Sequence, residues 1–469
     1  MDQFTQWLNR KRTVILLMMT AFVIRGGLAV IIGERYLPMA DQIVFVELAK
    51  NIASGKGMMI TDRLILPFLD QPLEIQQRYY TMPERIRDLR MFALWGVIRP
   101  DTPTAFIEPM VPLIYAGIYK LFGASIVAPR LLQALLDALV VGMLFSLAAI
   151  AFPRSRAPGI AALIYTFYPF SIMFSCGLIT QPIYLFLQCL LIYVFYKFML
   201  KPGWGYALLL GLVLGLITLT RISIIAFAPF LFLALYLQDY HRPRWLPAAA
   251  AIILGALLII PWAVRNKNAL GEYILLPTKG GRNLWEYNNQ LFTREKREAP
   301  PDKYKGIDAL YYRFAGENFP RIQGKEYLEF PEFTDESELE RDRELNYRFQ
   351  QFMRLNPGIY LKLCFYRFYQ FFRITPSNYR HIFFQAASYL SYGWILPFSV
   401  FGLIILLKKY WRRIAPIVLL VFYNSGIHTL TASGIPHRMP IDPYLILFAA
   451  FALHWLLVKF EFIILKEEK

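Results

Sequence analysis

Charged residues are scarce in this sequence. They make up 18% of its 469 positions, against about 25% in a typical soluble domain, while hydrophobic residues make up 57%. Apolar runs with almost no charge recur from Thr13 to Leu465, and each is close to the roughly 20 residues that a helix needs to cross a bilayer. This composition excludes a soluble domain and a disordered chain, and it predicts an all-α polytopic membrane protein.

Cysteine is also rare, and several catalytic motifs are missing. Three cysteines (Cys176, Cys189 and Cys364) in so apolar a chain make no disulfide framework. The sequence has no Walker loop, HExxH, paired CxxC, GxSxG or dinucleotide fingerprint, so it gives no support to nucleotide-driven or zinc-hydrolase chemistry. It has no Asn-x-Ser/Thr sequon either, which favours a bacterial periplasm over a glycosylating lumen on the outer side.

The apolar runs predict about ten transmembrane helices. Their expected ranges are 13–33, 131–152, 158–176, 180–198, 205–220, 222–238, 246–264, 387–407, 414–431 and 442–460. With residues 10–12 in the cytoplasm, the short connections on that side hold most of the Lys and Arg of the short loops, which is the positive-inside pattern. These connections are 153–156, 197–201, 241–244, 408–413 and the tail 466–469. Topology therefore explains much of the net charge of +17, which gives no support to a nucleic-acid partner.

One further apolar stretch, 108–122, is short and contains Pro109 and Pro112. Counting it as a span would move every later basic connection to the outer side, so we place it as a re-entrant or interfacial helix. Two large segments, 34–130 and 266–385, then lie on the outer face. The chain is expected to divide into a seven-span module with the first outer segment (1–265), an outer region (266–385) and a three-span region (386–469).

Asp41 stands at the start of a short helix in the first outer segment. Apolar residues between 43 and 52 predict this helix, and Gly55 and Gly57 end it. Asp41 is then at or near the N-cap, immediately outside the membrane. From spacing alone, a capping carboxylate and a catalytic acid are both open interpretations.

The second outer segment opens with a cluster of cations. Lys279 and Arg282 flank two glycines that let the backbone approach a ligand closely, and Arg265 stands at the end of the span that leads in. Cations beside free backbone N–H groups suit a phosphate. An ordinary turn with solvated cations that face lipid headgroups is the competing interpretation.

Charged residues inside spans are costly, and they are usually paired or functional. Arg25 lies inside the first expected span, while Arg130, Gln133 and Asp137 share one face at the start of the second. A buried ion pair between Arg25 and Asp137 is the simplest interpretation. Arg221, at an outer helix end, is open to snorkelling toward the interface.

Two more segments near the outer face contain basic residues. His437 and Arg438 lie among three prolines just above the membrane, where a lone histidine is more often a polar surface residue than a ligand. The stretch 356–373 mixes basic and aromatic residues, as an interfacial helix does.

In their order along the chain, these elements resemble the membrane glycosyltransferases of the GT-C fold. The similarity is to bacterial relatives of protein O-mannosyltransferases and of the lipid A aminoarabinose transferase, and it extends over nearly the whole chain. The motifs are AKNIASGKG (49–57), VPLIYAGIYKLFG (111–123), LLQALLDAL after Arg130, LTR (219–221), PWAVRN (261–266), GGRNLWEYNN (280–289), NPGIYLKL (356–363) and HRMPIDPYL (437–445).

The resemblance implies a fold, a reaction and a location. The donor would be a sugar linked to polyprenyl phosphate in the outer leaflet, and the sugar would move with inversion to a glycan, lipid or protein acceptor outside the membrane. A divalent cation accompanies the site in some members, so it is a possible cofactor here. The expected location is a bacterial inner membrane, with the active site facing the periplasm.

The resemblance also suggests roles for individual residues. Asp41 would be the general base that deprotonates the acceptor. The expected ligands of the donor phosphate are Arg265, Lys279 and Arg282, with Arg438 behind them, and the expected substrate-binding residues are Asn283, Trp285, Asn288 and His437.

Two departures from the family pattern affect the site. Relatives often have a second acid directly after the first, but Gln42 follows Asp41 here, so Glu47 or Glu108 is the candidate second acid. Relatives of the lipid A enzyme have a lysine where this chain has Glu108, so the donor phosphate must be bound differently. The insertion at 58–105 has no counterpart and is a candidate acceptor site.

Two other functions share part of this pattern. A transporter or flippase of lipid-linked sugars has similar hydropathy, but it needs polar residues at mid-membrane and no large one-sided loops. An O-antigen polymerase or ligase shares the donor type, but it centres on arginines and a histidine in one late loop. The acid after the first span favours the transferase.

Overall fold

The computed structural model describes residues 11–35, 41–60, 101–237, 245–289, 292, 307–329, 331, 333, 336–375 and 382–467. Within these ranges the regular secondary structure is helical, with a single isolated β-bridge between Met59 and Pro103. Most of the 58–105 insertion and the expected basic connection 241–244 lie outside the described residues. The chain is all-α, as predicted from its composition.

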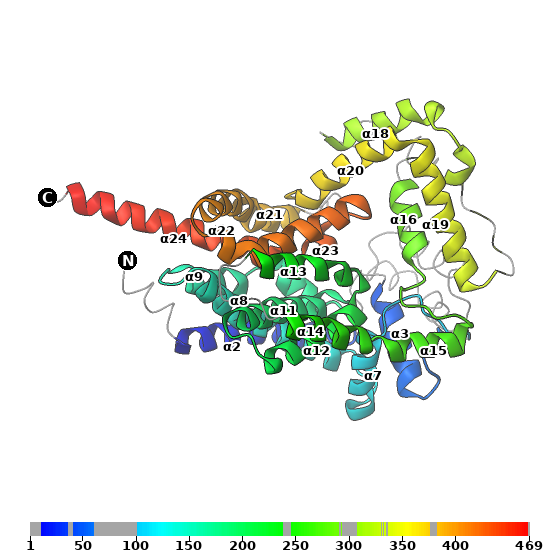
Figure 1. Ribbon diagram of the computed structural model, residues 1–469, viewed down its shortest axis with the longest axis horizontal. Coiled ribbons are helices and arrows are strands. Elements are labelled where there is room, and N and C mark those ends of the chain that lie inside the picture. The colour runs from blue at the N-terminus through cyan, green and yellow to red at the C-terminus, as the bar shows by residue number, and fades with distance from the viewer. Residues whose placement is uncertain are drawn as a thin grey trace.

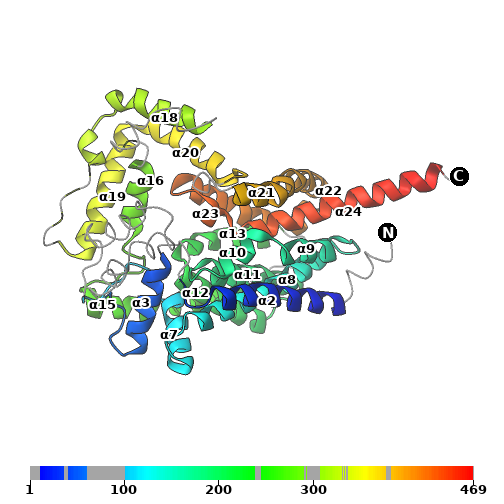
Figure 2. The same ribbon diagram turned by 180° about the vertical axis from the view of Figure 1, so that it is seen from behind.

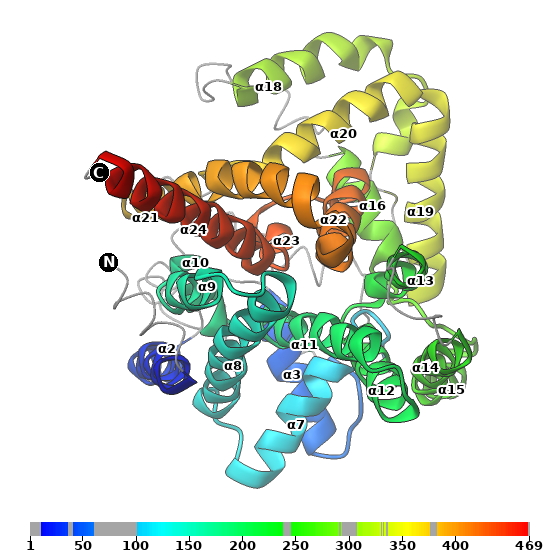
Figure 3. The ribbon, with the colours of Figure 1, turned by 60° about the vertical axis from the view of Figure 1, so that its left-hand side comes forward.

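Most of the apolar helices form a membrane body. They are α2 (Lys11–Ile32), α8 (Val127–Ala151), α9 (Ala157–Thr166), α10 (Pro169–Ser175), α11 (Gln181–Leu200), α12 (Trp204–Thr220), α13 (Ala228–Tyr236), α14 (Trp245–Leu257), α22 (Tyr392–Leu430) and α24 (Asp442–Glu467). The helix α11 packs on α8 and α12, and α12 packs on α14, whereas α13 packs on α22, which in turn packs against α24 on the other side (Figure 3). Helices satisfy their own backbone hydrogen bonds, which is the requirement inside a bilayer.

The expected count of about ten spans is not confirmed. Six helices in the described ranges are long and apolar enough to cross a membrane, and α9 with α10 makes a seventh if this pair, bent by 53°, is one span. The difference arises because α12 and α13 are shorter than a usual span, and because two expected spans join in α22. The backbone of α22 breaks at Tyr410, within the expected basic connection 408–413.

The outer segments gather at one end of the body. This end contains α3 (Asp41–Ala53), α7 (Met110–Phe122), α15 (Ile260–Leu270), α16 (Gly280–Asn289), α18 (Ile307–Asn318), α19 (Glu338–Leu355) and α20 (Pro357–Phe372). The start of α2 and the end of α24 lie at the opposite end (Figures 1 and 2). The helix α7, with 13 residues, lies across the end of the bundle instead of along it, as expected for an interfacial helix.

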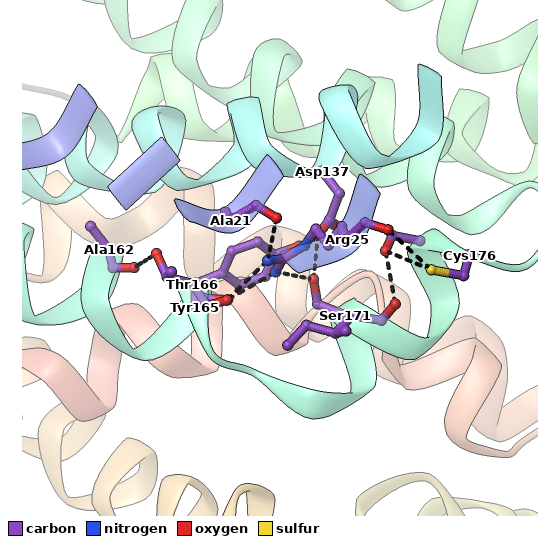
Figure 4. Close-up of polar contacts among 10 residues, drawn as sticks. Ala21, Arg25, Asp137, Ala162, Tyr165, Thr166, Ser171 and Cys176 are labelled. Carbon is purple, nitrogen blue, oxygen red and sulfur yellow. Dashed lines mark hydrogen bonds and ion pairs between the residues drawn. The ribbon is translucent and has the colours of Figure 1, made fainter. Parts of the chain in front are cut away.

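A buried ion pair holds the centre of the body together. Arg25 and Asp137 are paired, as expected, and their side chains are 0% and 3% exposed. The guanidinium also donates to the carbonyl oxygens of Tyr165 (3.1 Å) and Thr166 (2.9 Å), at the break between α9 and α10 (Figure 4). The last carbonyls of a helix lack some of their intrahelical donors, and Arg25 donates to two of them here.

The outer helices pack tightly around α16. A Cβ atom at Gly281 would lie 2.0 Å from the carbonyl oxygen of Asp342 in α19, so only glycine fits there. The Asp342 carboxylate accepts a 2.7 Å hydrogen bond from the Gly281 N–H, which caps the first turn of α16. Burial raises the pKa of Asp342 to about 6. The expected division of the chain at 265 and 385 stays a prediction.

Candidate functional site

Several polar side chains meet where the outer helices face the membrane body. They come from the segment just before α7, the junction between α12 and the short helix η2 (Ile222–Phe227), α16 with the residue before it, the end of α22 and the single turn α23 (Ile435–Arg438). The first residue of α3, Asp41, lies at the edge of this group. We describe this group below as the candidate site.

Glu108 and Lys279 form an ion pair in the candidate site. The Lys279 Nζ lies 2.9 Å from one carboxylate oxygen of Glu108, and the Ile222 N–H lies 3.4 Å from the other. The side chains are 10% and 25% exposed. Burial acts to raise the pKa of Glu108, but Lys279 and then Arg221 outweigh it, so the pKa is lowered. Glu108 is therefore a carboxylate that neutralises Lys279.

Arg221 lies beside this pair, at the end of α12. Its guanidinium carbon is 5.3 Å from the centre of the Tyr184 ring, which is a cation–π distance. The side chain is half-buried, and it makes no hydrogen bond or ion pair within the part of the chain that the structure describes. The positive charge of Arg221 contributes to the pKa shifts of Glu108, Tyr287 and His437, so it lies within reach of all three.

Three aromatic rings line the same space. The rings of Tyr287 and His437 meet edge-on at 6.0 Å, and His437 lies 4.6 Å from the ring of His428. Burial, with help from Arg221 and Lys279, lowers the pKa of His437 to about 3. His437 is thus a neutral imidazole at neutral pH, and its Nδ1 is buried without a hydrogen-bond partner among the described residues.

Asp41 faces this group from the start of α3. Its side chain is exposed, whereas the five residues that follow it are buried. Burial raises the pKa of the Tyr287 hydroxyl to about 12, and Glu286 and Asp41 act in the same direction against Arg282 and Arg221. Asp41, which follows the first span, and the cations Arg282 and Arg221 therefore lie around one tyrosine.

The helix α16 has two different faces. Trp285 donates from Nε1 to the Tyr327 carbonyl at 2.8 Å, and Asn288 accepts a 2.8 Å hydrogen bond from Arg367. These two residues thus pack against the outer helices. Their expected role in substrate binding stays a prediction, and these contacts do not favour it. Arg282 lies 3.5 Å from Glu286, and Asn283 is half-buried.

Arg265 and Arg438 are occupied by contacts within the protein. Arg265 donates to the carbonyls of Thr104 (2.8 Å) and Met58 (3.0 Å). Arg438 is fully buried, lies 3.0 Å from Asp442 and donates to the Arg373 carbonyl at 2.8 Å. Both arginines therefore join segments of the fold. Their expected role in phosphate binding stays a prediction.

Comparisons with known proteins identify the fold. Residues 101–264 match the family described as dolichyl-phosphate-mannose-protein mannosyltransferase. The apo oligosaccharyltransferase from Archaeoglobus fulgidus aligns with 98% of this chain and 52% of its own, at 13% identity and a TM-score of 0.55. Its complex with zinc and sulfate aligns with 95% of this chain and 50% of its own, at 13% identity and a TM-score of 0.51.

The chain has the GT-C fold of membrane glycosyltransferases. It spans about half the length of the archaeal oligosaccharyltransferase. ArnT from Cupriavidus metallidurans bound to undecaprenyl phosphate aligns with 94% of this GT-C chain and 77% of its own, at 12% identity and a TM-score of 0.40. No curated protein matches the sequence.

Three residues of the candidate site in this GT-C protein are not predicted as site residues from the sequence. Arg221 was interpreted only as a residue open to snorkelling, because the sequence does not show that α12 ends there against the outer helices. Tyr287 lies two residues after Trp285 in the WEY motif, and a helical period would have placed it on the opposite face from Trp285. His428 lies inside an expected span and gave no signal.

The possible divalent cation stays a prediction. In the described part of the chain, no group of three or more His, Cys, Asp and Glu side chains has the arrangement of a metal site.

Proposed function

We propose that this GT-C protein is a glycosyltransferase that moves a sugar from a polyprenyl-phosphate-linked donor to an acceptor on the periplasmic face. The observation that carries the proposal is the arrangement around Tyr287, where the Asp41 carboxylate and the cations Arg221 and Arg282 lie within electrostatic reach. A base and a group of cations on one side of a membrane are what this transfer needs.

The reaction follows from these two kinds of group. Asp41 takes the proton of an acceptor hydroxyl while the oxygen attacks the anomeric carbon of the sugar. The bond between that carbon and the phosphate oxygen breaks, and polyprenyl phosphate leaves with the electron pair. Because the attacking oxygen and the leaving group are on opposite faces of the carbon, the configuration inverts. Lys279 and Arg282 stabilise the charge that develops on the phosphate.

Glu108 has a different role in this proposal from Asp41. Its carboxylate is held by Lys279 at 2.9 Å and is 10% exposed, so it is poorly placed to accept a proton from an incoming acceptor. We assign it to orienting Lys279 beside the donor phosphate. Asp41 remains the base because its side chain is exposed at the edge of the candidate site.

The matched family supports the donor class. Its description names a dolichyl-phosphate-linked sugar, which is a polyprenyl-phosphate-linked donor, and the matched residues 101–264 include Glu108 and Arg221. The paired state of Arg25 and Asp137 argues against a transport path, because the charges at mid-membrane are buried and bound to each other. We therefore prefer transfer over transport of the lipid-linked sugar.

The first experiment compares the wild-type protein with Asp41→Asn. The purified protein in detergent is given a panel of radiolabelled polyprenyl-phosphate sugars, and sugar release is measured. Loss of the base is expected to slow consumption of the one accepted donor by roughly 10²- to 10⁴-fold.

The control is Glu317→Gln, which makes the same change from carboxylate to amide at an exposed residue of α18, outside the candidate site and outside the 58–105 insertion. This variant should keep wild-type activity. A folded Asp41→Asn protein that turns over as fast as wild type would show that Asp41 is not the base.

A further inference from the structure

Four cations were expected to bind the donor phosphate, and all four have partners within the protein. Lys279 is paired with Glu108, Arg282 with Glu286, and Arg438 with Asp442, whereas Arg265 donates to backbone carbonyls. Pairing lowers the net charge that each one offers to a ligand. A phosphate needs at least one cation that is not already neutralised.

Arg221 is such a cation. Its guanidinium has no hydrogen bond and no ion pair in the described ranges, although a half-buried arginine usually has several. The only close contact described for it is the face of the Tyr184 ring at 5.3 Å, which leaves the N–H groups at the guanidinium edge available. Its N–H groups are not among the buried atoms that lack a partner, so they are open to solvent and to an anion.

The surroundings of Arg221 are those of an anion site. Its neighbour in sequence, Ile222, lies with its N–H 3.4 Å from Glu108, so Arg221 is fixed beside the Glu108 and Lys279 pair. The neutral ring of His437 lies within electrostatic reach of Arg221 and keeps a buried Nδ1 without a partner in the described part of the protein.

We propose that Arg221 binds the phosphate group of the lipid-linked donor and of the polyprenyl phosphate that leaves, a role that rests on the proposed function. Its planar guanidinium makes two parallel hydrogen bonds to phosphate oxygens, which a lysine cannot reproduce. His437 adds one neutral hydrogen bond to the same group. Lys279, whose charge Glu108 partly balances, adds to the stabilisation of the same group.

The location of Arg221 explains how a membrane-bound donor reaches it. The residue follows directly after α12, at the outer end of the apolar body, and its backbone is extended where the helix stops. A phosphate at the headgroup level of the outer leaflet meets this position without leaving the membrane surface. The hydrocarbon chain then stays in the apolar layer while the sugar faces Asp41.

The test measures binding instead of turnover. The full-length protein in detergent is titrated with geranyl phosphate, which is a short prenyl phosphate, and with geraniol, which lacks the phosphate. The variants are Arg221→Met, which keeps the side-chain length without charge, and Arg221→Lys, which keeps the charge without the planar group. Arg343→Met is the matched control, because Arg343 is 62% exposed on the outer face and pairs only with Glu272 among the described residues.

The proposal predicts a loss specific to the phosphate. Arg221→Met should bind geranyl phosphate roughly 10- to 100-fold more weakly than wild type, since charged hydrogen bonds are lost. Arg221→Lys should show a smaller loss, and Arg343→Met none. Geraniol should bind the wild type and the three variants with equal affinity. A variant that had lost its structure would also bind geraniol more weakly.

Two results separate this inference from the proposed function. If wild type prefers geranyl phosphate over geraniol and Arg221→Met keeps that preference, the role of Arg221 is wrong while the donor class stands. If wild type shows no preference for the phosphate, the donor class itself fails. A third titration with dihexanoyl phosphatidylglycerol identifies the source of the phosphate, and tighter binding of this lipid than of geranyl phosphate overturns the assignment to the donor.

Discussion

Charged side chains have two different settings in this protein. Arg25 and Asp137 are buried in the membrane body, and every N–H of the Arg25 side chain described here points to an acceptor (Figure 4). Arg221 at the outer end has no such acceptor in the described ranges. All the hydrogen-bond donors of Arg25 have partners, so we assign a structural role to the Arg25 and Asp137 pair. Arg221 has donors without such partners, so we assign it a role in ligand binding.

The Arg25 pair makes a prediction about stability. Arg25→Met leaves Asp137 as an unpaired buried charge and removes the donors for the α9 break, so it should lower the free energy of unfolding by about 3–5 kcal/mol. The double variant Arg25→Met with Asp137→Leu should recover part of this loss. Thermal unfolding in detergent measures both, and equal stability of the single and double variants would contradict the account.

For single residues, the sequence predicts a buried ion pair better than it predicts which cations are available to bind a ligand. The pairing of Arg25 with Asp137 was expected because two opposite charges inside spans have few alternatives. The phosphate ligands could not be assigned in the same way, because a pattern of cations does not show which of them the fold neutralises. Only the three-dimensional contacts of Lys279, Arg265 and Arg438 show that these cations have partners.

At the scale of elements, α16 connects the outer helices to the candidate site. One side of the helix packs against α19, where Gly281 touches the backbone of Asp342. The other side carries Arg282 and Tyr287 toward Asp41 and His437. The position of the whole helix therefore decides whether the groups of the site are within reach of one another.

Two adjacent glycines test this role of α16. Gly281→Ala would place a Cβ 2.0 Å from the Asp342 carbonyl oxygen and force α16 away from α19, whereas an added Cβ at Gly280 has nothing within 4 Å. We expect Gly281→Ala to lower the free energy of unfolding by about 1–3 kcal/mol and to reduce donor consumption. Gly280→Ala should do neither. If unfolding and turnover are the same for both variants, the contact between α16 and α19 does not position the site.

The sequence predicts the apolar elements well and their breaks poorly. Hydropathy located the first span, the short helix at 110–122 and the helix that starts at Asp41, because length and composition determine each of them. It also separated the two halves of α22, whose backbone breaks at Tyr410 within the expected connection 408–413. It did not show that α9 and α10 bend by 53°, because this bend involves a tertiary partner, Arg25, which hydropathy does not include.

At the scale of the whole molecule, the candidate site and both outer segments lie at one end, and the start of α2 and the end of α24 lie at the other (Figure 1). The expected cytoplasmic connections include the exposed Lys201 before α12, whereas Arg221 of the candidate site follows the other end of this helix. The account therefore requires that the end with α16 and α19 faces the periplasm.

Cysteine labelling tests this orientation. The native cysteines are all buried, so Tyr347→Cys on α19 and Lys201→Cys between α11 and α12 give one reactive thiol each. In intact spheroplasts, a membrane-impermeant maleimide should label position 347 at once and label position 201 only after lysis. Labelling of position 201 first would reverse the topology and place the site in the cytoplasm.

The central claim is that this protein transfers a sugar from a polyprenyl phosphate. The most direct measurement follows polyprenyl-phosphate sugars, labelled separately in the sugar and in the phosphate, with the wild-type protein in liposomes. We predict that one donor of the panel is split, with its sugar released or transferred and its phosphate retained on the lipid. If a folded protein splits none of them and instead moves an intact donor between leaflets, the transferase account is contradicted and transport is the better one.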